Sequence, residues 1–109
     1  MASRAELHER LINLVSEILP INVAAARVKF QPSTNTKLTY PCVLYRTSSI
    51  DVKKADNQNY LKKTCYTLTV IDRDPDSPIR DLFIDFPYCR MSTPFVSDNL
   101  YHFPFTLYW

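Results

Sequence analysis

The first apolar series along the chain has the period of a helix. Its members recur every three or four positions, with charged and polar residues between them: Leu7, Leu11, Leu14, Val15 and Ile18. Ser3 and Glu6 precede the series at the spacing of a capping box, in which each side chain binds the other's backbone NH. Because Pro20 cannot continue a helix, the pattern predicts an amphipathic helix of about four turns between Ser3 and Pro20.

The middle of the chain predicts strands and one long hairpin. A short β-like run covers residues 27–31, and a polar loop follows over 32–39. Further on, an apolar run begins at Cys42, and residues 66–71 alternate between apolar and polar. The stretch 55–59 between them has turn chemistry. We therefore expect one hairpin with arms over about 42–54 and 60–71, long enough for its tip to stand clear of a small domain.

A second, short helix is predicted after the hairpin. Ser77 is a favourable N-cap, and Pro78 suits the first helical position because its missing NH is not needed there. The next apolar residues share one helical face, and Pro87 ends the run: Ile79, Leu82, Phe83 and Phe86. This apolar face is expected to pack on the sheet.

The C-terminal part predicts two more strands. Residues 89–96 have strand composition, and the last stretch is apolar at every second position: Tyr101, Phe103, Phe105, Leu107 and Trp109. Pro104 cannot donate to a ladder, so we expect this last strand at an edge or with a bulge. The order of elements predicts an α+β fold in a single domain over 1–109. Its small, mainly antiparallel or mixed sheet, with the long β-hairpin, packs against the N-terminal helix and the second short helix.

Composition excludes several classes of function. The 109 residues contain no glycine, which removes Gly-rich phosphate loops, the dinucleotide-binding fingerprint and the nucleophile elbow. The net charge of +2 arises without a long block of either sign, so charge gives no strong case for nucleic acid or membrane binding. Four charged residues interrupt the first apolar stretch, which is therefore neither a signal peptide nor a membrane span: Arg4, Glu6, Glu9 and Arg10.

The cysteines and histidines suggest no catalytic pair. Cys42, Cys65 and Cys89 are odd in number, widely spaced and without a CxxC motif, which fits a reducing cytoplasm and small buried apolar side chains. His8 lies on the predicted first helix and His102 on the last strand. Nothing in the sequence brings either histidine to a cysteine.

Three aspartates at alternate positions resemble the start of a calcium loop. Asp72, Asp74 and Asp76 match the first three ligands, but Ser77 stands where the loop needs glycine and Phe83 where it needs a bidentate glutamate. A polar turn whose acidic residues favour the helix N-terminus is the preferred interpretation.

A metal-dependent nuclease would need converging carboxylates and a lysine. Asp51 and Lys53, with the aspartates of residues 72–76, offer the residue types, but their spacing gives no reason for convergence. We therefore predict a protein that is not an enzyme, with no catalytic, metal or cofactor-binding residues.

The tip of the predicted hairpin is the feature least explained by folding one small core. It is either a solvated tip or an arm that packs on a neighbouring subunit. As a subunit contact it would use charged, amide and aromatic side chains: Lys53, Lys54, Asp56, Asn57, Tyr60, Lys62 and Lys63.

Several segments together resemble a known family, the tail terminator (tail completion) proteins of long-tailed bacteriophages. The most specific is the run Tyr66–Ser77 followed by a short helix. The others occur in order along the chain: Phe30–Pro32, Tyr40–Tyr45, Ala55–Asn57 with Tyr60 and Leu61, Asp98–Leu100 with His102, and Phe105–Trp109.

This resemblance implies a non-enzymatic virion protein without a cofactor. Such a protein forms a ring, typically a hexamer, on the head-proximal end of the tail tube, ends tube polymerisation and gives the head-to-tail connector a docking surface. The implied partners are further copies of the chain, the tail tube protein and the connector, with DNA only as cargo and no membrane. The implied location is the virion tail, and the host cytoplasm during assembly.

One alternative comes from another class of function. The lysine pairs at 53–54 and 62–63, together with the aromatic residues, would suit a small nucleic-acid-binding or processing protein of a mobile element. The near-neutral total charge and the core-like period of the aromatic residues argue against it.

Overall fold

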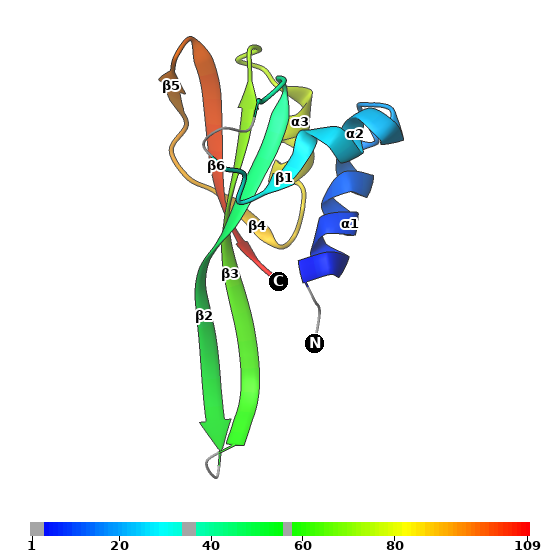
Figure 1. Cartoon of the computed structure of the whole chain (residues 1–109). Coiled ribbons are helices and arrows are strands. Elements are labelled where there is room, and N and C mark those ends of the chain that lie inside the picture. Colours follow the sequence, from blue (N-terminus) through cyan, green and yellow to red (C-terminus); the bar gives the residue numbers. More distant parts are fainter. Residues whose placement is uncertain (1–3, 34–36, 56–57) are drawn as a thin grey trace.

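The computed structural model describes residues 4–33, 37–55 and 58–109, and over 50–55 and 58–63 the backbone alone. Within these ranges the helices and strands follow one another in this order: α1 (Arg4–Val15), α2 (Ile21–Arg27), β1 (Val28–Phe30), β2 (Cys42–Ala55), β3 (Gln58–Asp72), α3 (Pro78–Ile84), β4 (Cys89–Met91), β5 (Phe95–Ser97) and β6 (Leu100–Tyr108). The helices cover one face of a twisted sheet, and the long β2–β3 hairpin extends away from them (Figure 1).

The sheet is mixed. Its strand order is β1-β2-β3-β6-β4. β5 pairs with the first part of β6, along the same edge of β6 that β4 occupies further on. β1 runs parallel to β2, whereas the other pairs are antiparallel. The predicted α+β class, with a long hairpin and helices packed on a mixed sheet, is therefore confirmed.

The core lies between the helices and one face of the sheet. From α1, Leu7, Leu11 and Val15 are fully buried at the four-residue spacing of one helical stripe. The strands contribute alternate residues to the same cluster, as a half-buried sheet requires: Val43, Tyr45, Tyr66, Leu68, Val70, Phe103, Phe105 and Leu107. Ile79 and Phe83 of α3 join the same cluster from the helix layer, beside α1, which confirms the predicted apolar face of this helix.

The first helix ends earlier than predicted. α1 stops at Val15, and the next turns are closed by tighter bonds from the NH groups of Glu17 and Ile18 to carbonyls three residues back. Ile18, predicted to lie on the apolar stripe, is 44% exposed. Ser3, the predicted cap, lies outside the described residues.

α2 was not predicted, because Pro20 was interpreted only as the end of the first helix. Pro20 also begins the second helix, since its carbonyl accepts the NH of Ala24 at 2.8 Å. The alanines at 24–26 favour a helix, and the side chain of Ala24 is buried. The turn through α2 leads the chain into β1, within the predicted strand at 27–31.

The hairpin contains two irregularities. Thr47 pairs with Tyr66 and Ser49 with Cys65, so Ser48 is an extra residue, and its hydroxyl donates to the Cys65 carbonyl at 3.0 Å. A second register shift follows Lys53. Bulges of this kind increase the local twist of a ribbon.

The predicted strand at 89–96 is two strands. Residues 92–94 interrupt it, and both pieces pair with β6. β6 is consequently an interior strand with β3 on its other side, so the expected edge position is wrong. The reason lies at Pro104, whose carbonyl accepts the NH of Ser92 at 2.8 Å. The NH and C=O of a strand residue point to the same side, so the missing NH of Pro104 faces the interruption and no ladder bond is lost.

The turn between β5 and β6 adopts a conformation that favours glycine, which the chain lacks. Asp98 and Asn99, between β5 and β6, have positive φ angles of 53° and 63°, the conformation that a tight hairpin turn demands. Asp and Asn tolerate this region better than other residues with a Cβ.

Before α3, the Ser77 hydroxyl accepts the NH of Arg80 at 3.3 Å, which confirms the predicted N-cap.

Candidate functional site

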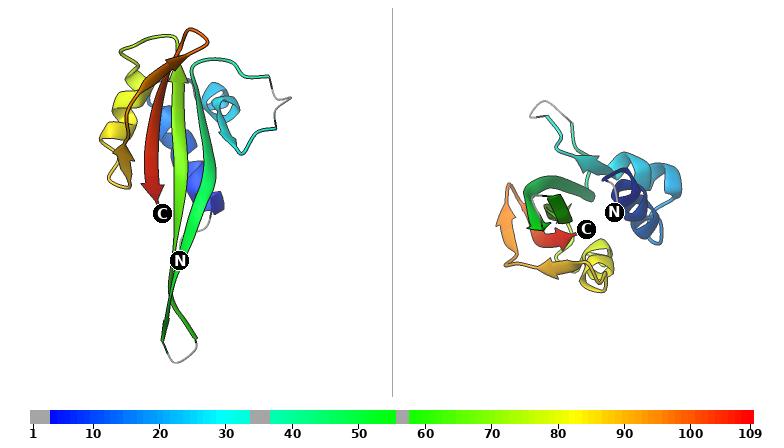
Figure 2. Two further views of the ribbon diagram at one scale, coloured as in Figure 1. Left: turned by 90° about the vertical axis from the view of Figure 1, so that its left-hand side faces the viewer. Right: turned by 90° about the horizontal axis from the view of Figure 1, so that it is seen from below.

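The outer part of the hairpin forms an arm without a third strand among the described residues. β6 pairs with β3 from Asp72 down to Cys65, and one more bond joins the Trp109 NH to the Thr64 carbonyl at 3.1 Å. Beyond that point β2 and β3 pair only with each other, out to Ala55 and Gln58. The molecule is consequently long, 51 × 31 × 28 Å, with the arm at one end (Figures 1 and 2). Isolated two-stranded ribbons are marginal in water, so the arm is suited to packing on another surface.

The structure brings five of the seven predicted contact residues into this arm. Lys53 and Lys54 lie in β2, and Tyr60, Lys62 and Lys63 lie in β3. Asp56 and Asn57 fall outside the described residues.

Pairing within the arm places unlike charges opposite each other at one position. Asp51 pairs with Lys63, an arrangement that supports the register. Two other lysines have apolar residues as their register partners: Lys53 pairs with Leu61 and Lys62 with Val52. Over residues 50–63 the sequence carries four lysines against two aspartates, so the arm has an excess of positive charge.

The sheet face opposite the helices contains a groove of about 530 Å³. Its lining mixes apolar, hydroxyl and basic side chains: Gln31, Pro32, Leu44, Tyr45, Arg46, Thr67, Thr69, Ile71, Phe95 and His102. The sequence did not predict this groove. The alternation of apolar and polar residues indicates which sheet face joins the core, and the other face is expected to contact solvent. The available signal was Leu44 and Ile71, two apolar residues at positions of the polar face.

One wall of the groove is an aromatic pair. The rings of Phe95 and His102 stack with centroids 4.7 Å apart and planes inclined by 13°. His102 Nδ1 lies 3.1 Å from the Leu100 carbonyl, which fixes the ring. Half of Phe95 is exposed, so the pair is accessible from solvent.

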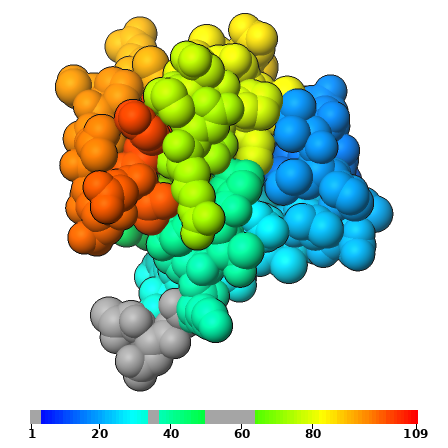
Figure 3. All heavy atoms as spheres, turned by 90° about the horizontal axis from the view of Figure 1, so that it is seen from above, coloured from blue at the N-terminus to red at the C-terminus, as the bar shows by residue number. Residues whose placement is uncertain are grey.

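Two of the three alternate aspartates stabilise the loop that contains them through their side chains. Asp72 Oδ1 accepts the NH of Asp74 at 3.1 Å, and Asp74 Oδ1 accepts the NH of Asp76 at 2.9 Å. Figure 3 shows this loop at the end of the molecule away from the arm, between the β5–β6 turn and the first helices. No group of three His, Cys, Asp or Glu side chains in the described part of the chain is placed to hold a metal ion.

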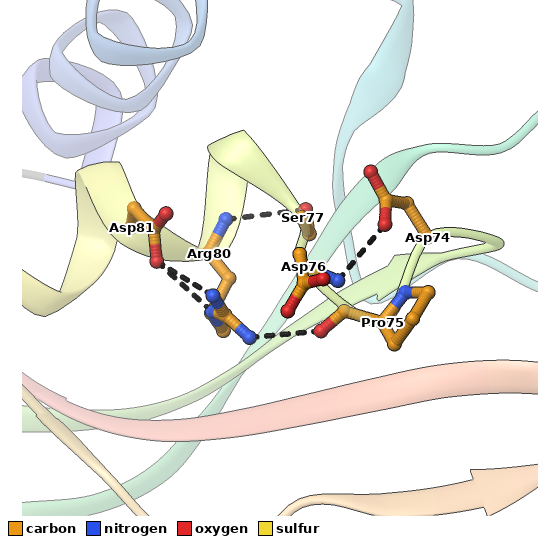
Figure 4. A network of polar contacts seen from close by, with 6 residues as sticks. All are labelled: Asp74, Pro75, Asp76, Ser77, Arg80 and Asp81. Carbon is orange, nitrogen blue, oxygen red and sulfur yellow. Dashed lines mark hydrogen bonds and ion pairs between the residues drawn. The ribbon is translucent and has the colours of Figure 1, made fainter.

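Arg80 ties this loop to α3. Its guanidinium binds the Asp81 carboxylate at 2.9 Å and the Pro75 carbonyl at 2.9 Å (Figure 4). The loop is therefore fixed by short-range polar contacts, which is consistent with a structural turn at the start of a helix.

All three cysteines are free thiols without a disulfide partner. Burial raises the pKa of Cys42 to about 11 and that of Cys89 to about 12, so both remain thiols at neutral pH. The ring nitrogens whose contacts are described go elsewhere: His8 to the Tyr45 hydroxyl and His102 to the Leu100 carbonyl. The described residues therefore offer no thiolate activated by a histidine.

Exposed apolar side chains lie on β4, β5 and the segments beside them. Those at least two-fifths exposed include Tyr88, Met91, Phe95, Val96 and Tyr108. β5 pairs with β6 alone, so its outer edge has no strand partner among the described residues. Edges of this kind are common sites of protein association.

None of the described helices has the length and apolar character needed to cross a membrane. In comparisons with known proteins, no protein-family model matches the chain, and no curated protein matches it in sequence.

Proposed function

We propose that this chain is a tail terminator of a long-tailed bacteriophage. In this proposal it forms a closed ring, hexameric as in the family it resembles, on the head-proximal end of the tail tube. The ring ends tube polymerisation and presents the docking surface for the head-to-tail connector. The observation that carries the proposal is the β2–β3 arm, which continues beyond its last contact with β6 at Thr64 and Cys65.

A ring needs two different surfaces on each subunit. When an arm on one copy packs on another surface of the next, the contact is heterologous and closes if the rotation per step divides a full turn. The arm supplies one such surface. The exposed apolar side chains near β4 and β5, with the unpaired outer edge of β5, supply candidates for the other.

Charge supports a channel that passes DNA without retaining it. The whole chain carries thirteen basic and eleven acidic side chains, and DNA binding normally requires a concentrated basic patch. The excess positive charge of the arm would be neutralised at a contact with a neighbouring subunit, so it need not line the channel.

Electron microscopy of the purified chain added to growing tail tubes tests this proposal. The expected result is extra density with ring symmetry at one end of each tube, together with an arrest of elongation. Bovine serum albumin at the same concentration is the control for unspecific arrest. Continued elongation with bare ends would contradict the proposal.

A further inference from the structure

The groove on the helix-free face of the sheet has the shape of a trough, and it is called the trough below. Leu44, Arg46, Thr67 and Thr69 from β2 and β3 form its floor. Because β1 and β5 lie on opposite sides of these two strands, the segment after β1 borders the trough on one side and the pair of Phe95 and His102 borders it on the other. A trough along the strand direction fits an extended chain better than a compact small molecule.

Above the arm, the charged residues that the strand register places on this face in the described strands are all basic. They are Lys29 of β1, Arg46 of β2 and Arg90 of β4. Above the arm, no Asp or Glu occupies a described position of this face in β2, β3, β4 or β6, since Asp72 lies at a position of the opposite face. Asp51 shares the face but lies in the arm, where it pairs with Lys63. Arg46 is exposed and makes no ion pair with the described residues. Its guanidinium is therefore available to a carboxylate, which it can bind through two parallel NH groups.

The charge also argues against the arm of a second copy as the occupant. Residues 50–63 carry four lysines and two aspartates, so the arm would bring more positive charge to a basic face. An acidic chain has the complementary sign. The exposed Phe95 ring and the side chain of Leu44 offer contacts to its apolar residues.

We propose that the trough binds an extended acidic segment of a partner protein, with Arg46 binding a carboxylate and the pair of Phe95 and His102 contacting an apolar side chain. This inference does not depend on the ring or on the arm. A chain that failed to cap tubes would still bind such a segment.

The test uses two labelled hexapeptides, one alternating glutamate with leucine and one alternating glutamine with leucine. Fluorescence anisotropy measures their binding to the full chain in 0.1 M salt. We expect saturable binding of the glutamate peptide and at least tenfold weaker binding of the glutamine peptide. Arg46→Gln should weaken binding of the glutamate peptide at least tenfold. Arg10→Gln is the matched control, because Arg10 is also exposed but lies on α1, and it should change the affinity less than twofold.

Amide chemical shifts locate the bound peptide independently of affinity. The largest changes are expected at Thr67, Thr69 and Phe95. The proposal is overturned if the glutamate peptide shows no saturable binding up to millimolar concentration, if the two arginine variants lose affinity equally, or if the shifts map to the helices. Self-association that Arg46→Gln abolishes, without peptide binding, would identify a second copy as the occupant and would equally overturn it.

Discussion

The imidazole of His8 and the phenol of Tyr45 are joined by a hydrogen bond of 2.6 Å between Nδ1 and the hydroxyl oxygen, across 37 positions of sequence. Burial, aided by the nearby positive charge of Arg4, lowers the pKa of His8. Burial raises the pKa of Tyr45. Both pKa shifts favour the neutral forms, in which the phenol donates a hydrogen bond to the imidazole nitrogen. The bond fixes α1 on β2, next to the core stripe of Leu7 and Leu11.

The lowered pKa of His8 predicts a loss of stability in acid. As pH falls below about 6.5, the ordinary histidine value, the unfolded chain takes up the proton before the folded protein does, so the free energy of unfolding decreases until the folded-state pKa is passed. Urea unfolding between pH 7.5 and 5 should show this decrease, and His8→Gln should reduce it. His102→Gln is the control and should leave most of the slope in place. An unchanged slope in His8→Gln would refute this assignment.

The C-terminal strand predicts a large packing effect. Phe105 is 1% exposed, and its ring centroid lies 5.9 Å from that of Phe83 in α3. Phe105→Ala removes this contact between sheet and helix and should cost about 3–5 kcal/mol of unfolding free energy, close to the whole margin of a small domain. Val96→Ala, at a side chain 62% exposed, should change stability by less than about 0.5 kcal/mol. Chemical denaturation measures both, and equal effects would show that the strand is not part of the core.

How far the sequence predicts this fold depends on whether a local pattern has one meaning. The alternation of 66–71 and of the last nine residues predicted β3 and β6, two of the three interior strands, because a period of two with large apolar residues is specific. Pro20 gave an incomplete prediction, because a proline can mark the end of one helix and also the start of the next. The prediction from Pro104 was wrong. Whether a missing NH is tolerated depends on the neighbouring strand, and the interruption at residues 92–94 cannot be inferred from position 104.

The candidate sites differ in the same way. The arm could be predicted, because strand length and turn position are local properties. The groove could not, because it depends on β5 and the segment after β1 meeting the same sheet face from opposite sides. Phe95 and His102 are seven positions apart, and only the turn at Asp98 and Asn99 stacks their rings.

The raised thiol pKa of Cys42 predicts slow alkylation. The pKa of this thiol is about 11 against the ordinary 9.0. Its thiolate fraction at pH 8 is therefore about a hundredfold lower than that of an exposed cysteine. Iodoacetamide should therefore label a Cys65→Ala/Cys89→Ala variant at least a hundredfold more slowly in buffer than in urea. Mass spectrometry follows the reaction. Similar rates in the two solvents would contradict the burial of this thiol.

The aspartate loop is expected to be structural. Asp74→Asn keeps a side-chain oxygen that can accept the NH of Asp76, so the loop should survive with a change in stability below about 0.5 kcal/mol. Calorimetry with calcium and magnesium should detect no tight binding by either the parent or the variant. Tight binding by the parent that the substitution abolishes would show a metal site at this loop.

We propose that the arm joins neighbouring subunits of a ring on the tail tube. The triple variant Tyr60→Ala, Lys62→Glu, Lys63→Glu changes three arm positions that lie beyond the pairing of β3 with β6. Its control, Lys29→Glu with Lys37→Glu, makes two of the same charge reversals away from the arm. Circular dichroism establishes that both fold.

The decisive measurement is the fraction of tube ends that carry a ring in electron micrographs. We expect this fraction to fall to near zero for the arm variant and to stay at the parental value for the control. A folded arm variant that caps as many ends as the parent would show that the arm does not join the subunits.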